Sequence, residues 1–194
     1  MHSCVYVIIS ANTNDVEAAV AKALAPFDEA LTVPPYKVHL SSSCIRAMAE
    51  QYKLPETNLK LLAGKMKDWM RCPGGVDELG VFATWTSNPD GKWDWYEIGG
   101  RWDGLITGRK RPNSDVLRNN SIRASTLLRA RDFSARIPFS IVTPTGEWVE
   151  RSTFETTSTG WYTRETPTDV WTAHVRRILA AFPMFRVVCV DTHC

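Results

Sequence analysis

The chain has 194 residues, of which 44% are hydrophobic and 10% aromatic, so its composition predicts a globular core. This length is typical of one domain, and we predict a single domain over residues 1–194. No apolar run reaches the length of a membrane span and no secretory signal is recognisable, which argues against membrane-spanning and secreted classes. We therefore expect a cytoplasmic protein without a membrane partner.

The first part of the chain is predicted to contain two strands and three helices. Residues 4–9 form an apolar run suited to a buried strand, and a helix with an apolar stripe follows over 15–25. A short strand is expected over 36–40, and a helix capped by serines runs from there to about residue 52. A third helix over 57–70 has Met and Trp at helical spacing, which is typical of a helix that faces a core.

Residues 88–104 are unusually rich in large aromatic residues, with three Trp and one Tyr within ten positions. Pro89 and Gly91 predict a hairpin turn that joins a strand over 81–86 to a strand over 92–98. Alternation along the second strand predicts one face with Trp93, Trp95 and Glu97, and an opposite face with Asp94, Tyr96 and Ile98.

Two interpretations of this stretch are open. In one, the Trp side chains are core, because large aromatics dominate core energetics. In the other, they stack on a flat ligand such as a base, Arg101 holds its phosphate, and Gly99 and Gly100 offer N–H groups to an anion. Asp94 and Asp103 would then orient the arginine or bind a metal. The candidate ligand-binding residues are Trp93, Trp95, Tyr96, Gly99, Gly100, Arg101 and Trp102.

Residues 105–137 are predicted to be a basic insert within the domain, of the kind that is typical of a mobile loop. Between Arg101 and Arg136 nine Lys and Arg stand against three Asp, a net +6. The whole chain carries +2, so the remainder sums to −4. Such a segment is either a solvated loop or an electrostatic footprint for phosphate.

The remaining elements are a hairpin over 139–150 with its turn at Pro144 and Gly146, a helix over 166–182 and a buried strand over 186–191. Strands outnumber what a parallel doubly wound sheet needs. We therefore predict an α+β fold, mainly an antiparallel sheet with a ferredoxin-like core and helices packed on one face. The first and last strands are the most apolar and should lie centrally.

If those two strands pair antiparallel, His2 and Cys4 lie near Asp191, His193 and Cys194. These residue types ligate metals, with zinc as the expected ion, and Asp191 can fix the tautomer of His193 in an acid–base site. A purely structural or frayed terminus is the alternative. The candidate catalytic residues are His193 and Asp191, and the candidate metal ligands are His2, Cys4, Asp191 and His193. The five cysteines lack Cys-x-x-Cys spacing, which indicates reduced thiols.

The segment Lys-Trp-Asp-Trp-Tyr-Glu-Ile-Gly-Gly-Arg-Trp-Asp-Gly, residues 92–104, resembles a segment of uncharacterised proteins from bacteriophages and their bacterial hosts. Shorter blocks resemble the same group at residues 24–29, 73–78, 143–148, 160–161 and 187–193. Members of the group begin with Ser-His-Phe, where this chain has His2-Ser3-Cys4, and residues 105–137 lie outside the blocks. The resemblance implies a phage or prophage accessory protein in the bacterial cytoplasm, and it transfers no activity.

Three functions are compatible with these patterns. The first is a binding protein for a nucleotide or a single-stranded nucleic acid, which in a phage setting would counter a host defence system. The second is an inhibitor that binds a host protein, with the Trp cluster as core. The third is a small metal-dependent hydrolase or transferase that uses the chain ends. No Ser-His-Asp set, Cys-His set or phosphate loop identifies an enzyme, so the question of catalysis stays open.

Overall fold

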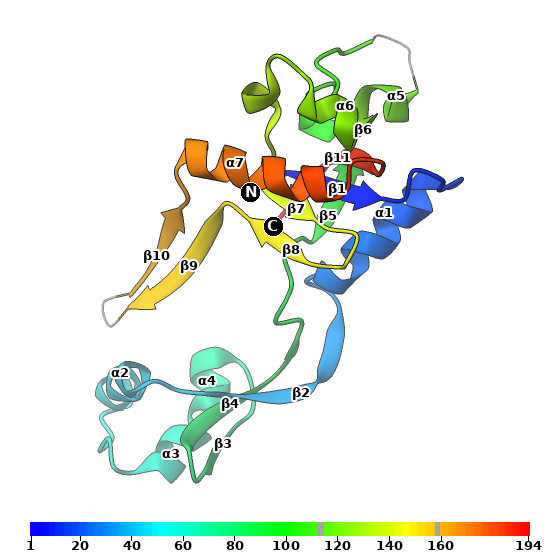
Figure 1. Cartoon of the computed structure of the whole chain (residues 1–194). Helices are drawn as coiled ribbons and strands as arrows, with labels where there is room; N and C mark the ends of the chain where they lie inside the picture. The colour runs from blue at the N-terminus through cyan, green and yellow to red at the C-terminus, as the bar shows by residue number, and fades with distance from the viewer. Residues whose placement is uncertain (112–114, 158–159) are drawn as a thin grey trace. The chain divides into compact units, whose positions relative to one another are not determined.

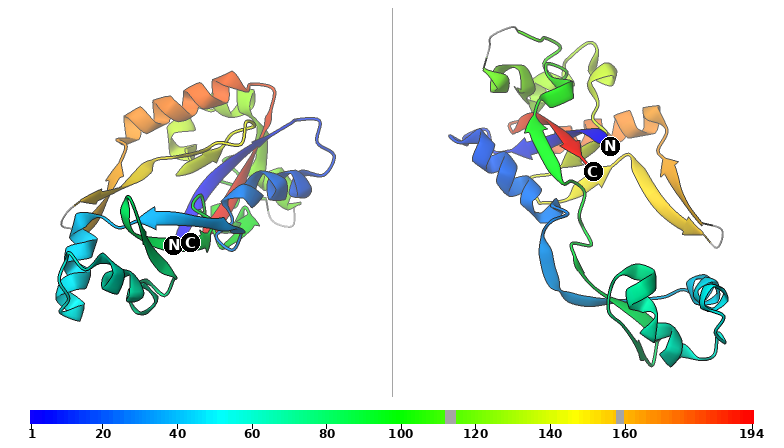
Figure 2. Two further views of the ribbon diagram at one scale, coloured as in Figure 1. Left: turned by 90° about the horizontal axis from the view of Figure 1, so that it is seen from below. Right: turned by 180° about the vertical axis from the view of Figure 1, so that it is seen from behind.

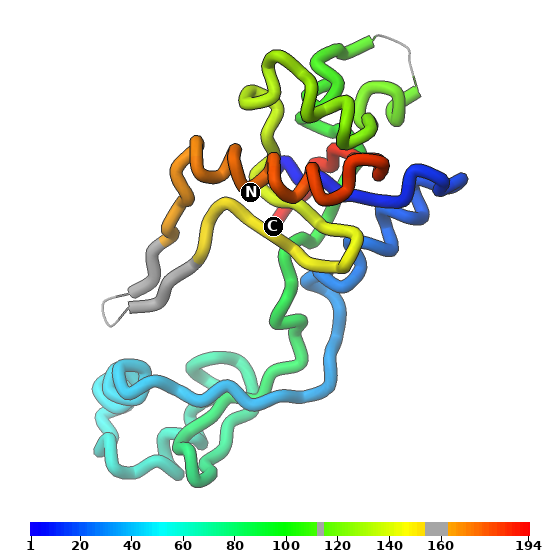
Figure 3. The backbone as a smooth tube through the Cα atoms, in the orientation of Figure 1, coloured from blue at the N-terminus to red at the C-terminus, as the bar shows by residue number. Residues whose placement is uncertain are grey.

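The computed structural model describes the backbone of residues 1–111, 115–157 and 160–194, and their side chains except those of 154–162. The chain forms two compact units, which can be followed along the backbone in Figure 3. Unit 1 contains Met1–Glu29 and Asp90–Cys194, and unit 2 contains Ala30–Pro89. The chain that its length suggested to be one domain is thus organised as two units.

A sheet of six strands organises unit 1 (Figure 1). Its order is β5-β11-β1-β7-β8, and β6 pairs with β11 as well. The β1–β7 pair is parallel and the other pairs are antiparallel. The strands are β1 (His2–Ile9), β5 (Trp95–Ile98), β6 (Ser121–Arg123), β7 (Ser140–Val142), β8 (Trp148–Glu150) and β11 (Arg186–His193).

The two longest strands of unit 1 form the centre of this sheet, as their apolar sequences predicted. β1 pairs antiparallel with β11 in a register that runs from His2↔His193 to Ile9↔Arg186. Most residues of both strands are buried, because each strand has neighbours on both edges and side chains packed on both faces. The register brings the two chain ends together, and Figure 2 shows them side by side in both views.

Helices cover both faces of the sheet. Tyr6 and Ile8 of β1 pack with α7 (Thr168–Ala181) and α6 (Ala124–Leu128), whereas Val5 and Val7 pack with α1 (Val16–Leu24). The α+β class is confirmed, and the ferredoxin-like core stays a prediction. The expectation of helices on one face is corrected, because both sets of alternating side chains on the central strands are apolar and each needs cover.

Short elements complete unit 1. The polar segment after β8 forms the antiparallel pair β9 (Ser152–Thr157) and β10 (Gly160–Glu165). One further helix and three 3₁₀ turns connect the strands, namely α5 (Val116–Asn120), η1 (Ala25–Phe27), η2 (Gly100–Trp102) and η3 (Phe133–Arg136). Among the described residues, no helix combines the length and apolar composition that crossing a bilayer requires.

Unit 2 is a three-stranded antiparallel sheet with three helices. The strand order is β2-β4-β3, and Met48, Leu62 and Met66 form a core with Val81 and Ala83 of β4. The elements are β2 (Thr32–His39), α2 (Ser42–Tyr52), α3 (Leu59–Gly64), α4 (Met66–Met70), β3 (Gly74–Asp77) and β4 (Gly80–Ser87).

The hairpin expected between residues 81–86 and 92–98 is absent from the structure. β4 uses both of its edges, one for β2 and one for β3, so it has no edge left for the next strand. The next strand, β5, pairs with β11 in unit 1 instead. Residues 88–91 therefore connect the two units rather than turn a hairpin.

A carboxylate at the end of β3 supplies a pH-dependent contact in unit 2. Asp77 lies 2.8 Å from Lys37 Nζ and 2.9 Å from His39 Nε2, and the hydrogen bond from Lys37 is the main cause that lowers the pKa of Asp77 to about 2. The folded-state pKa is below the ordinary value of 3.8, so the ionised form stabilises unit 2 above about pH 4. That stabilisation is lost as the pH falls towards 2.

Replacing Lys37 by glutamine is expected to raise the pKa of Asp77 towards its ordinary value, because the charged donor is removed. The measurement is an NMR titration of the Asp77 carboxyl carbon. Lys60→Gln removes an exposed lysine elsewhere in unit 2 and should leave that pKa unchanged. An Asp77 titration that is the same in both variants would contradict the assignment.

Candidate functional site

Trp93 and Tyr96 are core residues rather than a surface for a ligand. Trp93 is 9% exposed, and its Nε1 donates to the Leu24 carbonyl oxygen at 3.0 Å. The Tyr96 ring packs edge-on against it, with the centroids 5.0 Å apart. Trp93 shares this cluster with Ile98, so the prediction that it lies on the same face as Trp95 is wrong; β5 begins only at Trp95.

The other two aromatic residues of the segment have different surroundings. Trp95 is 48% exposed and lies on β5 opposite His193. Trp102 packs on the cluster that contains Tyr6 and Trp171, and its buried Nε1 has no described hydrogen-bond partner. The indole rings of this segment therefore do not form a common floor, and the stacking interpretation is corrected for the segment as a whole.

The paired glycines make room for a buried carboxylate. Gly100 has φ +49°, and a Cβ there would lie 2.6 Å from both Cβ and Oδ2 of Asp191. The Arg101 backbone N–H donates to Asp191 Oδ2 at 3.0 Å, while the Arg101 side chain is exposed. Gly99 has φ +80° and lies against Asn120. The glycines thus allow the close backbone approach that any other residue would prevent.

Two histidines stand beside that carboxylate, each with an aspartate partner. His2 Nδ1 lies 2.9 Å from Asp191 Oδ1, and His193 Nδ1 lies 2.8 Å from Asp94 Oδ1. The ring centroids of His2 and His193 are 5.0 Å apart. The expectation that the chain ends meet is confirmed, but Asp191 pairs with His2 rather than with His193. The hydrogen bond from His193 lowers the pKa of Asp94.

Cys4 does not belong to this polar cluster. Its Sγ lies 3.7 Å from Cys189 Sγ in the core, and this hydrogen bond, with burial, raises the pKa of the Cys4 thiol well above its ordinary value. A protonated thiol is a poor metal ligand. Across residues 1–111, 115–157 and 160–194, no group of three or more His, Cys, Asp and Glu is arranged to hold a metal ion. The geometry therefore gives the zinc hypothesis no support.

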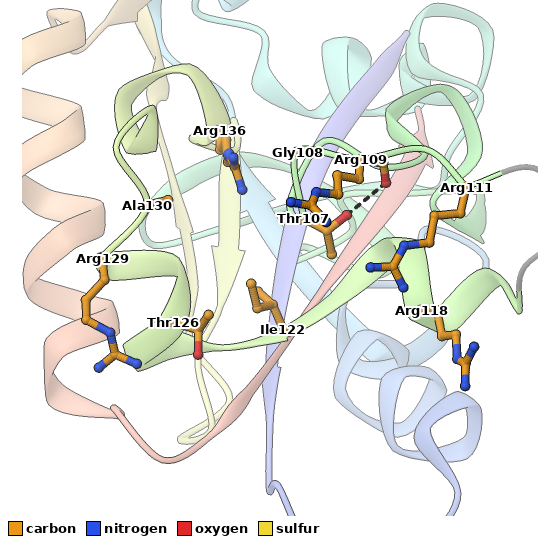
Figure 4. Close-up of a pocket in the computed structure, with 10 residues that line it drawn as sticks. All are labelled: Thr107, Gly108, Arg109, Arg111, Arg118, Ile122, Thr126, Arg129, Ala130 and Arg136. Atoms are coloured by element: carbon orange, nitrogen blue, oxygen red, sulfur yellow. Dashed lines mark hydrogen bonds between the residues drawn. The ribbon is translucent and has the colours of Figure 1, made fainter.

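A cavity of about 500 Å³ lies in the segment that was predicted to be a basic insert (Figure 4). Among the described residues, no carboxylate lines it. Its lining is Thr107, Gly108, Arg109, Arg111, Arg118, Ile122, Thr126, Arg129, Ala130 and Arg136. In Figure 4 Arg109, Arg111 and Arg118 lie to one side of Ile122, and Arg129 lies to the other.

A second cavity of about 480 Å³ adjoins the first, because both are lined by Arg118 and Ile122. It adds Arg123 and Arg186 to the lining, together with one acid, Asp115. We call the two cavities together the arginine groove. Its lining contains seven arginines and one carboxylate, so the surface of the arginine groove is strongly basic.

Buried asparagines hold the walls of the arginine groove. Asn120 is fully buried; its Oδ1 accepts from the Gly104 N–H at 2.9 Å and its Nδ2 donates to Asp103 Oδ1 at 2.8 Å. Asn119 Oδ1 accepts from the Arg111 N–H at 3.2 Å. These bonds fasten the chain before the groove to α5, which carries both asparagines.

The segment predicted to be a mobile insert is therefore part of the fold of unit 1, apart from residues 112–114, which lie outside the described residues. β6 pairs with β11, and Leu127 and Phe133 join the core under α7. A run of two asparagines is typical of an exposed turn, so the sequence carried little signal for these two buried positions.

The arginines of the groove differ in how far they are neutralised. Arg136 is anchored, with Nη2 2.6 Å from an Asp132 carboxylate oxygen and Nη1 3.3 Å from the Ile106 carbonyl oxygen. Arg109, Arg118 and Arg129 are exposed, and within the described chain they form no ion pair. The groove therefore presents positive charge that the fold itself leaves unbalanced.

Comparison of the chain with protein-family models, with curated protein sequences and with solved structures finds no match. The site must therefore be interpreted from its own chemistry.

Proposed function

We propose that this protein binds single-stranded nucleic acid through the arginine groove. The observation that carries the proposal is the lining of two adjoining cavities by seven arginines and a single carboxylate. A guanidinium offers a planar fork of N–H donors that matches phosphate oxygens, and it stays charged at any physiological pH.

The shape of the groove favours a phosphodiester chain over a single nucleotide. Arg118 and Ile122 line both cavities, so the phosphate-binding groups form a continuous path with positions on either side of them. A mononucleotide would leave most of these arginines without an anion. The described lining contains no aromatic residue, which suits binding of the backbone without preference for a base sequence.

The test is fluorescence anisotropy with a labelled single-stranded oligonucleotide over a series of salt concentrations. Wild-type affinity should fall as salt rises, because bound counterions are released from the phosphates. Replacing Arg109, Arg118 and Arg129 by glutamine should reduce the slope of log affinity against log salt by about 2, from about 0.7 per lost contact, and weaken binding at least about 100-fold.

A matched control removes three exposed charges from unit 2, at Lys53, Lys60 and Lys67. This variant should keep most of the affinity and the wild-type slope. Equal losses in the two triple variants, or binding that does not respond to salt, would overturn the proposal. Binding of ATP as tight as that of the oligonucleotide would replace the nucleic acid with a nucleotide as the ligand.

A further inference from the structure

We infer that His2 and His193 form an acid–base pair that cleaves the phosphodiester bond of single-stranded RNA. The inference deepens the proposed function, since it names the reaction that the bound nucleic acid would undergo. It rests on two histidine–aspartate pairs that lie side by side at one end of the central strands of unit 1. No other described histidine pair of the chain is arranged in this way.

The hydrogen bonds fix which nitrogen of each ring is available. Both Nδ1 atoms face an aspartate oxygen, at 2.9 Å for His2 and 2.8 Å for His193. The neutral imidazole therefore carries its proton on Nδ1 and leaves Nε2 as an acceptor, as a general base requires. Asp191 and Asp94 act as positioning residues, because each holds its imidazole in this tautomer and stabilises it when protonated.

The construction around Asp191 goes beyond what packing needs. Its side chain is 2% exposed, and a buried carboxylate is costly unless it is hydrogen-bonded. Unit 1 meets this cost with the Arg101 N–H, the His2 imidazole and the space left by Gly100. A buried carboxylate beside a histidine that is partly accessible to solvent is the arrangement expected of an oriented acid–base residue.

Two imidazoles suffice for one balanced reaction on RNA. Nε2 of the neutral ring accepts the proton of the ribose 2′-hydroxyl, and the 2′ oxygen attacks the adjacent phosphorus. The bond from phosphorus to the 5′ oxygen breaks, and that oxygen takes a proton from the other ring, which is an imidazolium. The products are a 2′,3′-cyclic phosphate and a 5′-hydroxyl, and proton exchange with water restores the pair. No metal or redox partner takes part.

Nearby surfaces suit this substrate. The ring of the exposed Trp95 lies 6.2 Å from that of His2, centroid to centroid, and offers a face on which a base can stack. β5 and β6 follow one another along the same edge of β11, so the histidines and the arginine groove lie towards opposite ends of that strand. At about 3.3 Å per residue the two are roughly 20 Å apart, a span of several nucleotides.

Other titratable or charged groups also surround the pair and belong in any pH analysis. Glu97 of β5 and Cys4 of β1 both lie opposite Asp191 in the sheet. The amino terminus contributes to the lowered pKa of Asp94, after the larger effects of His193. Arg101 follows Gly100 with an exposed side chain.

The experiment uses a labelled single-stranded RNA, the same sequence in DNA, and the DNA with one ribonucleotide, each with the intact protein in EDTA. Wild type should cut the RNA, should cut the mixed strand only after its ribonucleotide, and should leave DNA intact. The new end should be a 2′,3′-cyclic phosphate. The rate should pass through a maximum with pH, because one ring must be neutral and the other protonated.

Variants separate catalysis from folding. His2→Gln and His193→Gln should each lower the cleavage rate about 100-fold or more while anisotropy still reports wild-type binding. Asp94→Asn changes a half-exposed side chain, so it spares the core; it should slow cleavage while anisotropy still reports wild-type binding of the RNA. The control His39→Gln, in unit 2, should leave both the cleavage rate and RNA binding unchanged.

Each outcome decides between the two ideas. Binding without cleavage by wild type would overturn the inference and leave the proposed function intact. So would cleavage of DNA at the same rate, or full activity in both histidine variants. Cleavage that survives the three arginine substitutions would uphold the inference and count against the arginine groove as the binding surface.

Discussion

Replacing Asn120 by alanine is expected to destabilise unit 1 by about 2–4 kcal/mol, because it leaves the buried Gly104 N–H without its acceptor and removes a fully buried amide from the interior. Asn120 is fully buried and bonds to the Gly104 N–H, to Asp103 and to the Val116 carbonyl oxygen. Each buried group that loses its only partner costs about 1–3 kcal/mol, and the missing amide also leaves a cavity.

Urea unfolding monitored by tryptophan fluorescence measures this loss. A second readout is the pKa of Asp103, which the hydrogen bond from Asn120 lowers more than any other cause and which should therefore rise. The matched control is Asn58→Ala, which removes a single cap contact to the Leu61 N–H at 3.3 Å and should cost about 1 kcal/mol. Similar losses of stability in the two variants would show that Asn120 does not hold the walls of the arginine groove.

Replacing Gly100 by alanine should cost about 2–4 kcal/mol, of which backbone strain is the smaller part. A Cβ at this position would lie 2.6 Å from Cβ and Oδ2 of Asp191. Asp191 belongs to the central strand β11 and cannot withdraw without breaking the sheet. Either its carboxylate leaves His2 and the Arg101 N–H, or η2 moves away from the strand.

Gly146→Ala is the matched control, since Gly146 has φ +84° but no heavy atom within 4 Å of the added Cβ. This variant should lose roughly 1 kcal/mol of stability, because alanine is strained in the left-handed region, and no steric clash adds to that loss. The difference between the two variants in thermal unfolding therefore isolates the contact with Asp191. If the two variants lose the same stability, the close contact between residue 100 and Asp191 does not contribute to the free energy of unfolding. The ¹⁵N shifts of the His2 ring would report separately whether its bond to Asp191 survives.

Local patterns predicted the elements that need no distant partner. The helices at α1, α2 and α7 and the hairpin of β7 and β8 follow from caps, apolar periodicity and turn residues. The central pair of β1 and β11 was also predictable, because continuous apolar strands belong in the middle of a sheet. That pairing alone placed His2 near Asp191 across 189 positions of sequence.

The features that could not be predicted depend on which distant segments of the chain pair with each other. Residues 81–86 carry the same strand signal whether they pair with β5 or with β2 and β3. Trp93 faces the core because a bend at Asp94 separates it from β5, and alternation along one continuous strand cannot reveal such a bend. The arginine groove is lined by residues between 107 and 136 and by Arg186, so the sequence showed the charge of this segment but not its concave shape.

The position of β11 in the sheet also determines the order in which a nascent chain can fold. β1, β5 and β6 all hydrogen-bond to β11, which is translated after each of them. Until the ribosome has released residues 186–193, these three strands lack their common partner and expose unpaired edges. Unit 2 is one continuous segment, so it can fold on the emerging chain while unit 1 still waits, a period in which chaperones would have most to protect.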